Sequence, residues 1–206
     1  MSSIKDLEKI NTPKFWNDIY KKNEAGWDTG STTPAFVNYF KSIKTSKKII
    51  VPGAGNGYDC IYLSSLNHSV YAVDFAEKAI DNMNSNNVSN LNVIFEDYFN
   101  LDSKYNNTFD YFLEYTFYCA INPSRRYEYI KKAYNLLKPN GIFVGFLLPV
   151  NKPLDSDGPP FGVPLKQTEK IFSDFFKDIK ISKSKYSIKA RIDNELFITM
   201  KKKCLK

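Results

Sequence analysis

From residue 48 onward, short apolar runs alternate with longer stretches that mix apolar and charged positions. Runs of β-branched and aromatic residues predict buried strands, and apolar positions three and four apart predict amphipathic helices. We therefore predict helices over 58–66, 76–83 and 125–137, and strands over 48–51, 69–73, 91–95, 109–113 and 142–148. This alternation is typical of a parallel sheet with helices on both faces.

The N-terminal part of the chain follows a different pattern. Thr12 and Pro13 provide an N-cap and a first-turn proline for a helix whose apolar residues lie at helical spacing and which stops by Gly26. The glycines and the proline between Gly26 and Pro34 predict an ordered loop. A second helix is expected over 34–43.

The C-terminal part predicts two strands in succession. After a helix over 167–175, strands are expected over 179–190 and 196–201, joined by a tight turn at Asp193-Asn194, so they must be antiparallel. The prediction is thus an α/β fold with a seven-stranded, mostly parallel sheet, a C-terminal antiparallel hairpin and helices on both faces. A parallel sheet that ends in such a hairpin is the plan of Rossmann-like class I methyltransferases rather than of ordinary dehydrogenases.

Length and composition favour one domain over residues 1–206, in which residues 1–45 form a helical cap over the site. No run approaches the roughly twenty apolar residues of a membrane span, so we expect a cytoplasmic monomer without a membrane partner. Cys60, Cys119 and Cys204 are odd in number and far from His68 in sequence, so neither a disulfide framework nor a metal site is expected.

The formal net charge of +7 raises the alternative of an RNA partner. The lysines are scattered along the chain, however, and the one dense run, 201–203, lies at its end. We therefore expect no nucleic acid partner, an expectation that salt-sensitive RNA binding would reverse.

A glycine-rich segment lies directly between the first predicted strand and its helix, with Gly53, Gly55 and Gly57 at alternate positions. Glycines let the backbone turn sharply and approach a ligand at the carboxyl ends of parallel strands. The dinucleotide motif needs its third glycine three residues after the second, whereas Gly57 follows Gly55 by two. This spacing favours S-adenosylmethionine over a nicotinamide dinucleotide, and the alternative is a tight turn without a ligand.

Acidic residues follow the next two predicted strands. Asp74, with Phe75 after it, ends a strand about twenty residues beyond the glycines, where a carboxylate can accept both hydroxyls of an adenosine ribose. Capping of the helix that starts at Ala76 is the alternative for this residue. Asp97 is suited to accept a hydrogen bond from the adenine amino group while Tyr98 packs on its ring, or it is an ordinary loop acid.

An aromatic-rich segment follows the fourth predicted strand, at the strand end that faces the transferable methyl group in the methyltransferase plan. Enzymes that methylate amino groups of bases commonly carry Asn/Asp-Pro-Pro-aromatic at this place. This chain has Glu114-Tyr115-Thr116-Phe117 instead, which disfavours base methylation.

Four separated motifs make the chain resemble the thiopurine S-methyltransferase family over about residues 13–165. They are Phe15-Trp16 with Gly26 to Gly30 and Pro34, the segment 51–59, the segment 115–121 with Pro123 and Arg126, and Gly158-Pro159-Pro160-Phe161. The chain looks most similar to the plant and microbial branch that methylates thiols, thiocyanate and halide ions.

The resemblance implies a role for each matching position. Trp16 and Trp27 are implied to cover the cofactor, and the loop with Gly53 and Gly55 to hold its methionine part. Asp74 is implied to bind the ribose, Asp97 and Tyr98 to contact the adenine, and Tyr115 to lie near the methyl group. Phe75 is expected among the cofactor-binding residues without a more specific role. Simple helix packing is the alternative for Trp16. Glu114 stands where the related proteins usually have Asp, and Ala54 stands where Cys is common. We therefore assign neither residue a catalytic role.

The resemblance further implies an S-adenosylmethionine-dependent methyltransferase whose acceptor is a small molecule: a thiol, thiocyanate, sulfide or a halide ion. The alternatives are a small-molecule N- or O-methyltransferase of the same fold and a noncatalytic protein that binds S-adenosylmethionine. Methyl transfer from a sulfonium is an in-line displacement that needs alignment and desolvation but no compulsory proton relay. Tyr115 and Trp27 are expected to stabilise the sulfonium by cation–π attraction, and residues 154–164 to join the N-terminal cap as a lid.

Overall fold

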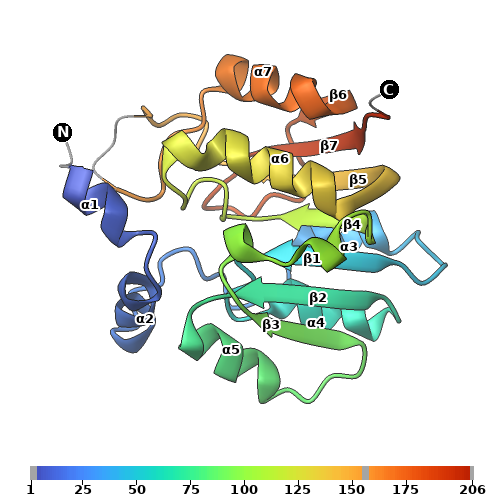
Figure 1. Ribbon diagram of the computed structural model, residues 1–206, viewed down its shortest axis with the longest axis horizontal. Helices are drawn as coiled ribbons and strands as arrows, with labels where there is room; N and C mark the ends of the chain where they lie inside the picture. The colour runs from blue at the N-terminus through green and yellow to red at the C-terminus, as the bar shows by residue number, and fades with distance from the viewer. Residues whose placement is uncertain (1–3, 155–157, 205–206) are drawn as a thin grey trace.

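The computed structural model describes residues 4–154 and 158–204. Within this part, seven strands form one sheet in the order β3-β2-β1-β4-β5-β7-β6 (Figure 1). They are β1 (Lys48–Pro52), β2 (Ser69–Asp74), β3 (Leu91–Phe95), β4 (Phe109–Glu114), β5 (Leu137–Leu147), β6 (Phe176–Ser182) and β7 (Leu196–Lys202). β1 to β5 pair in parallel, and β7 pairs antiparallel with both β5 and β6. The predicted mostly parallel sheet with a C-terminal antiparallel pair is confirmed.

Helices cover both faces of this sheet. They are α1 (Ile4–Lys9), α2 (Pro13–Lys21), α3 (Pro34–Phe40), α4 (Tyr58–Ser65), α5 (Glu77–Asn84), α6 (Arg126–Leu136) and α7 (Leu165–Phe175), with 3-10 turns η1 (Tyr98–Asn100), η2 (Ser103–Tyr105) and η3 (Pro123–Arg125). In Figure 1, α6 and α7 lie in front of the sheet and α3 and α4 behind it. No helix in the described part of the chain is long and apolar enough to cross a membrane.

The predicted elements recur with shifted ends. α1 was not predicted, and α2 ends at Lys21 rather than near Gly26. Thr12 is the N-cap of α2, but its hydroxyl donates to the Lys9 carbonyl at 2.7 Å and does not cap the helix. β5 begins at Leu137, directly after α6, and its pairing with β4 shifts register before it continues from Ile142.

The predicted tight hairpin at the C-terminus is wrong. β6 spans Phe176–Ser182 instead of 179–190, and residues 183–195 form a series of turns before β7 begins. The last register pair of the two strands is Ser182 with Phe197, so few residues of β7 remain to pair with a longer β6. Backbone groups in this connection form hydrogen bonds with each other, such as that from the Asn194 N–H to the Arg191 carbonyl at 2.9 Å, instead of pairing with a strand.

Aromatic side chains fill the space between the sheet and its helices. Phe36 and Phe40 of α3 are fully buried, and the Phe36 ring lies 5.8 Å from that of Phe146 on β5. On the other face, the rings of Phe112 and Phe143 stack at 4.9 Å. α3 therefore belongs to the core, which fixes the loop before it against the sheet.

Candidate active site

A cavity of about 790 Å³ lies at the carboxyl ends of the parallel strands. Residues at four strand ends line it, namely Gly53, Asp74, Thr116 and Leu148. The strand arrows in Figure 1 point toward α1 and α2, which lie beyond the strand ends. Open parallel sheets bind ligands at this edge because the strands end and the connections diverge there.

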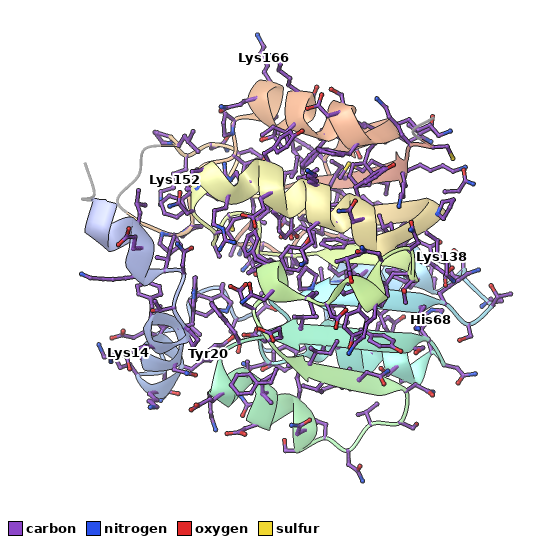
Figure 2. All side chains as sticks on the ribbon, viewed as in Figure 1. Lys14, Tyr20, His68, Lys138, Lys152 and Lys166 are labelled. Carbon is purple, nitrogen blue, oxygen red and sulfur yellow. The ribbon has the colours of Figure 1, made fainter. Side chains whose placement is uncertain are left out.

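Aromatic residues of α2 and the following loop form one wall of the cavity. The rings of Trp16 and Trp27 meet edge to face at 5.4 Å, and the ring of Tyr20 lies 5.7 Å from that of Trp27. All three line the cavity. The Trp16 indole N–H donates to the Ile10 carbonyl at 2.8 Å, which fixes its ring. Figure 2 shows Tyr20 between α2 and the strand ends.

The glycine loop after β1 is a close-fitting cradle. Gly53 has a φ of +59°, and a Cβ there would lie 2.6 Å from Cδ2 of Phe117, so both the backbone and the space require glycine. The next glycine, Gly55, donates its N–H to Oδ2 of Asp74 at 2.9 Å. Gly53 lines the large cavity, and both glycines line a smaller cavity beside it.

Asp74 ends β2 and faces the same cavity while 9% exposed. Its Oδ1 accepts from the N–H of Ala76 and its Oδ2 from that of Gly55, both at 2.9 Å. Burial raises the pKa of this carboxyl, and these backbone donors oppose the rise. A carboxylate offers about four acceptor positions, so two remain for ribose hydroxyls. Asp74 accepts from the N–H of Ala76, the N-cap residue of α5, but makes no side-chain cap to the helix itself, and it retains acceptor capacity on the cavity side.

The far end of the cavity combines aromatic and charged groups. Phe75, Asp97 and Phe99 line it, and the guanidinium of Arg125 stacks 3.4 Å from the centre of the Phe99 ring. The Asp97 side chain accepts from the Phe99 N–H at 2.9 Å and so begins η1. Tyr98 is only 2% exposed. It lines the cavity as predicted, although its ring packs in the aromatic core and its hydroxyl donates to the Tyr129 carbonyl at 2.9 Å. The half-buried Phe99 therefore offers more ring surface here than Tyr98.

Tyr115 lies beside the large cavity rather than on its lining. It lines a smaller cavity of about 80 Å³ that shares Trp27, Gly53 and Thr116 with the large one and also contains Gly55. Its hydroxyl donates to Oε2 of Glu195 at 3.3 Å. Burial raises the pKa of this phenol well above its ordinary value.

Residues of the irregular 183–195 connection complete the cavity. Arg191 lines it, donates from Nη2 to the Trp27 carbonyl at 2.8 Å, and places its guanidinium 4.8 Å from the centre of the Tyr115 ring. Its Nη1 is buried and has no hydrogen-bond partner within the described part of the chain. Sequence reasoning missed Arg191 because its segment was predicted as the end of a hairpin.

Other lining residues were missed for want of a local signal. Two of them, Ile10 and Asn11, lie before α2, and two others, Phe99 and Arg125, belong to no recognised motif. Tyr20 was predicted only as an apolar position of the N-terminal helix. Helical spacing from Trp16 was the one indication that Tyr20 shares the face turned to the site. The described part of the chain contains no group of three or more His, Cys, Asp or Glu side chains suited to a metal ion.

The sheet order, the glycine cradle and the acid after β2 define a class I S-adenosylmethionine-dependent methyltransferase. Solved structures of this class share the fold. The 1,6-didemethyltoxoflavin-N1-methyltransferase of Burkholderia thailandensis, solved with S-adenosylhomocysteine, has a TM-score of 0.71 at 17% identity and covers 98% of this chain and 91% of its own. A TehB-like S-adenosylmethionine-dependent methyltransferase from Corynebacterium glutamicum has a TM-score of 0.66 at 14% identity, covering 93% and 98%.

The chain belongs to the thiopurine S-methyltransferase family, whose model matches residues 11–196. Thiocyanate methyltransferase 1 of Brassica oleracea is 29% identical over 188 residues, 87% of this chain and 81% of that protein. Probable thiol methyltransferase 2 of Arabidopsis thaliana is 26% identical over 203 residues, 95% and 84% of the two chains. The chain is therefore an enzyme that uses S-adenosylmethionine to methylate a small molecule.

Proposed function

We propose that the chain methylates a small anionic or thiol nucleophile: a thiol, thiocyanate, sulfide or a halide ion. The observation that carries this proposal is the guanidinium of Arg191, which lines the cavity beside the Tyr115 ring and whose buried Nη1 has no hydrogen-bond partner among the described residues. A buried donor on a cation is costly unless an acceptor reaches it, and an anionic acceptor provides one. The names of the thiocyanate and thiol methyltransferases that match most of the chain support the same class.

In this proposal the chain binds, orients and dehydrates the reactants. When bound, S-adenosylmethionine supplies an electrophilic methyl group on a cationic sulfonium. The rings of Tyr20 and Trp27 exclude water and offer cation–π stabilisation, about 0.5–2 kcal/mol each. Arg191 holds the incoming anion. A thiolate or an inorganic anion needs no general base, and the single histidine, His68, lies at the opposite end of the sheet (Figure 2).

We propose the remaining site roles as the sequence predicted them, with two adjustments. Trp16 and Trp27 cover the cofactor, Gly53 and Gly55 hold its methionine part, Asp74 its ribose and Asp97 its adenine, and Phe75 also contacts it. Tyr98 supports the adenine end from within the core. The Tyr115 hydroxyl is already bonded to Glu195. We therefore assign Tyr115 the role of positioning Arg191, which contacts its ring and bonds the Trp27 carbonyl.

We further propose that residues 13–33 form the lid, because α3, the last helix of the predicted cap over 1–45, is buried in the core. Pro159 and Pro160 line the opposite rim, and residues 155–157 of the predicted lid segment lie outside the described residues. A single domain, a monomer, a cytoplasmic location and the lack of a nucleic acid partner stay predictions.

The test is incubation of the purified protein with methyl-labelled S-adenosylmethionine and separate acceptors: iodide, thiocyanate, hydrogen sulfide, small thiols and amines. Label transfer to the anions and thiols, with little to amines, is the expected result. Transfer to amines alone would instead support an N-methyltransferase. Binding of S-adenosylhomocysteine without turnover of any acceptor would support a noncatalytic protein.

A further inference from the structure

The last residue of β4, Glu114, is a fully buried acid that accepts three hydrogen bonds. Its Oε1 accepts from the backbone N–H of Phe117 at 2.9 Å and of Tyr118 at 2.8 Å, and its Oε2 accepts from the hydroxyl of Tyr129 on α6. Glu114 does not line the cavity. Its carboxyl group therefore acts on the protein itself rather than on a bound molecule.

The turn that Glu114 holds shapes one wall of the cavity. Within it, Thr116 has a φ of +67°, a left-handed conformation that a β-branched residue rarely adopts without support. Thr116, Phe117 and Cys119 all line the cavity, and Phe117 is the side chain packed against Gly53. The two N–H bonds to Oε1 are the contacts that hold this backbone in place.

The same turn also anchors the strap over residues 158–163. The Cys119 carbonyl accepts from the Phe161 N–H at 2.8 Å. Arg126, whose guanidinium lies 4.7 Å from the centre of the Tyr118 ring, donates to the carbonyls of Gly162 at 2.8 Å and Phe161 at 3.3 Å. Gly158, Pro159 and Pro160 of the strap line the cavity. One carboxyl group thus supports two neighbouring segments of the cavity wall.

We propose that Glu114 is a positioning residue for methyl transfer, which sets the turn after β4 and, through it, the strap. The inference rests on the proposed function only where it is tested by kcat, because that measurement needs a methyl acceptor. Burial raises the pKa of Glu114 to about 7, so both protonation states occur near neutral pH. Oε1 remains an acceptor in both, and a proton on Oε2 can bond the Tyr129 oxygen. Geometry, and not charge, is what Glu114 provides.

Three variants separate geometry from charge. Glu114→Gln keeps an acceptor oxygen for both N–H groups and an amide that bonds the Tyr129 oxygen, so its kcat is expected within about threefold of the unmodified chain. Glu114→Asp is one methylene shorter and Glu114→Ala has no acceptor. Both are expected to lose at least tenfold in kcat, because small displacements of a site are costly, while the affinity for S-adenosylhomocysteine stays within about threefold.

Amide hydrogen exchange gives a readout that needs no acceptor. Peptides covering 115–121 and 158–163 should exchange at least tenfold faster in the Asp and Ala variants and at the unmodified rate in the Gln variant. Leu136→Ala, a core change at the far end of α6, is the control for general destabilisation and should leave kcat and these two peptides unchanged.

Two results would overturn the inference. One is a folded Gln variant that binds S-adenosylhomocysteine yet loses activity as the Ala variant does, since charge would then be required. The other is unchanged exchange in the Asp and Ala variants. An unmodified chain that methylates no acceptor would instead refute the proposed function, and the exchange data would still decide the role of Glu114.

Discussion

Asp74 provides the most direct test of the proposed cofactor site. Its carboxylate accepts hydrogen bonds from two backbone N–H groups, and its remaining acceptor positions are proposed to bind the ribose hydroxyls. Removal of the side chain should therefore affect both the protein and the ligand. A hydrogen bond to a charged group is worth about 1.5–3 kcal/mol. Loss of even one bond to the ribose predicts that Asp74→Ala weakens S-adenosylhomocysteine binding at least tenfold, about 1.4 kcal/mol.

Weaker binding alone would not show that Asp74 contacts the ribose, since the variant also releases Gly55. We therefore pair the variant with a ligand change in calorimetry, comparing S-adenosylhomocysteine with its 2′-deoxy analogue. The unmodified chain should prefer the hydroxylated ligand by about tenfold, and Asp74→Ala should lose this preference. Such a cycle isolates the pairwise interaction from the shared loss of loop structure.

The matched control is Asp102→Ala, because Asp102 also accepts from the N–H two residues ahead, that of Lys104 at 2.7 Å, but does not line the cavity. It should bind both ligands as the unmodified chain does. If Asp74→Ala lost the same factor for both ligands, its role would be confined to the glycine loop and α5. Unchanged affinity would show that the ribose assignment is wrong.

Three further predictions concern the cradle, the acceptor and pH. Gly53→Ala, strained at its φ of +59° and crowded by Phe117, should lower the free energy of unfolding by about 1–3 kcal/mol in urea titrations; equal stability would mean that the loop relaxes freely. Arg191→Met should raise the KM for thiocyanate at least tenfold while the affinity for S-adenosylhomocysteine changes less than threefold, and the reverse pattern would assign Arg191 to the cofactor carboxylate. Burial raises the pKa of Glu114 from 4.5 to about 7, so the stability tied to this group is present at low pH and is lost as the pH rises through 7. Glu114→Gln lacks this titration, so its stability relative to the unmodified chain should increase by on the order of 3 kcal/mol between about pH 4 and about pH 8, and a flat difference would contradict the raised pKa.

Local sequence patterns predicted the part of the fold that local interactions determine. β1 to β4 were predicted within one residue of their ends, because an apolar run followed by glycine or an acid marks each boundary. The end of β6 has no such mark. Apolar and polar residues alternate again from Tyr186 to Ala190, which predicts a longer strand, but pairing with β7 stops at Phe197. A long-range register, which no local pattern encodes, decides where that strand ends.

The residues proposed to hold the cofactor could be named from the sequence for the same reason. Gly53 and Asp74 lie directly at strand ends, so the topology brings them together once the strand order is known. Tyr98 shows the limit of this reasoning. Tyr98 lines the cavity beside Asp97, yet its hydroxyl donates to a carbonyl 31 residues away on α6, a partner that only the folded chain reveals.

The acceptor side depends on segments that no strand end fixes. Arg191 reaches the Trp27 carbonyl, 164 residues away in sequence, only because residues 183–195 leave the sheet and turn back over the strand ends. A tight hairpin would have kept this stretch in the sheet, with alternate side chains on opposite faces and no guanidinium at the cavity. Under the proposed function, acceptor preference can therefore change through the 183–195 connection and the loop at Trp27 while the glycine loop after β1 stays intact. This separation explains why the class of enzyme was evident from the sequence, whereas its acceptor must be argued from the folded structure.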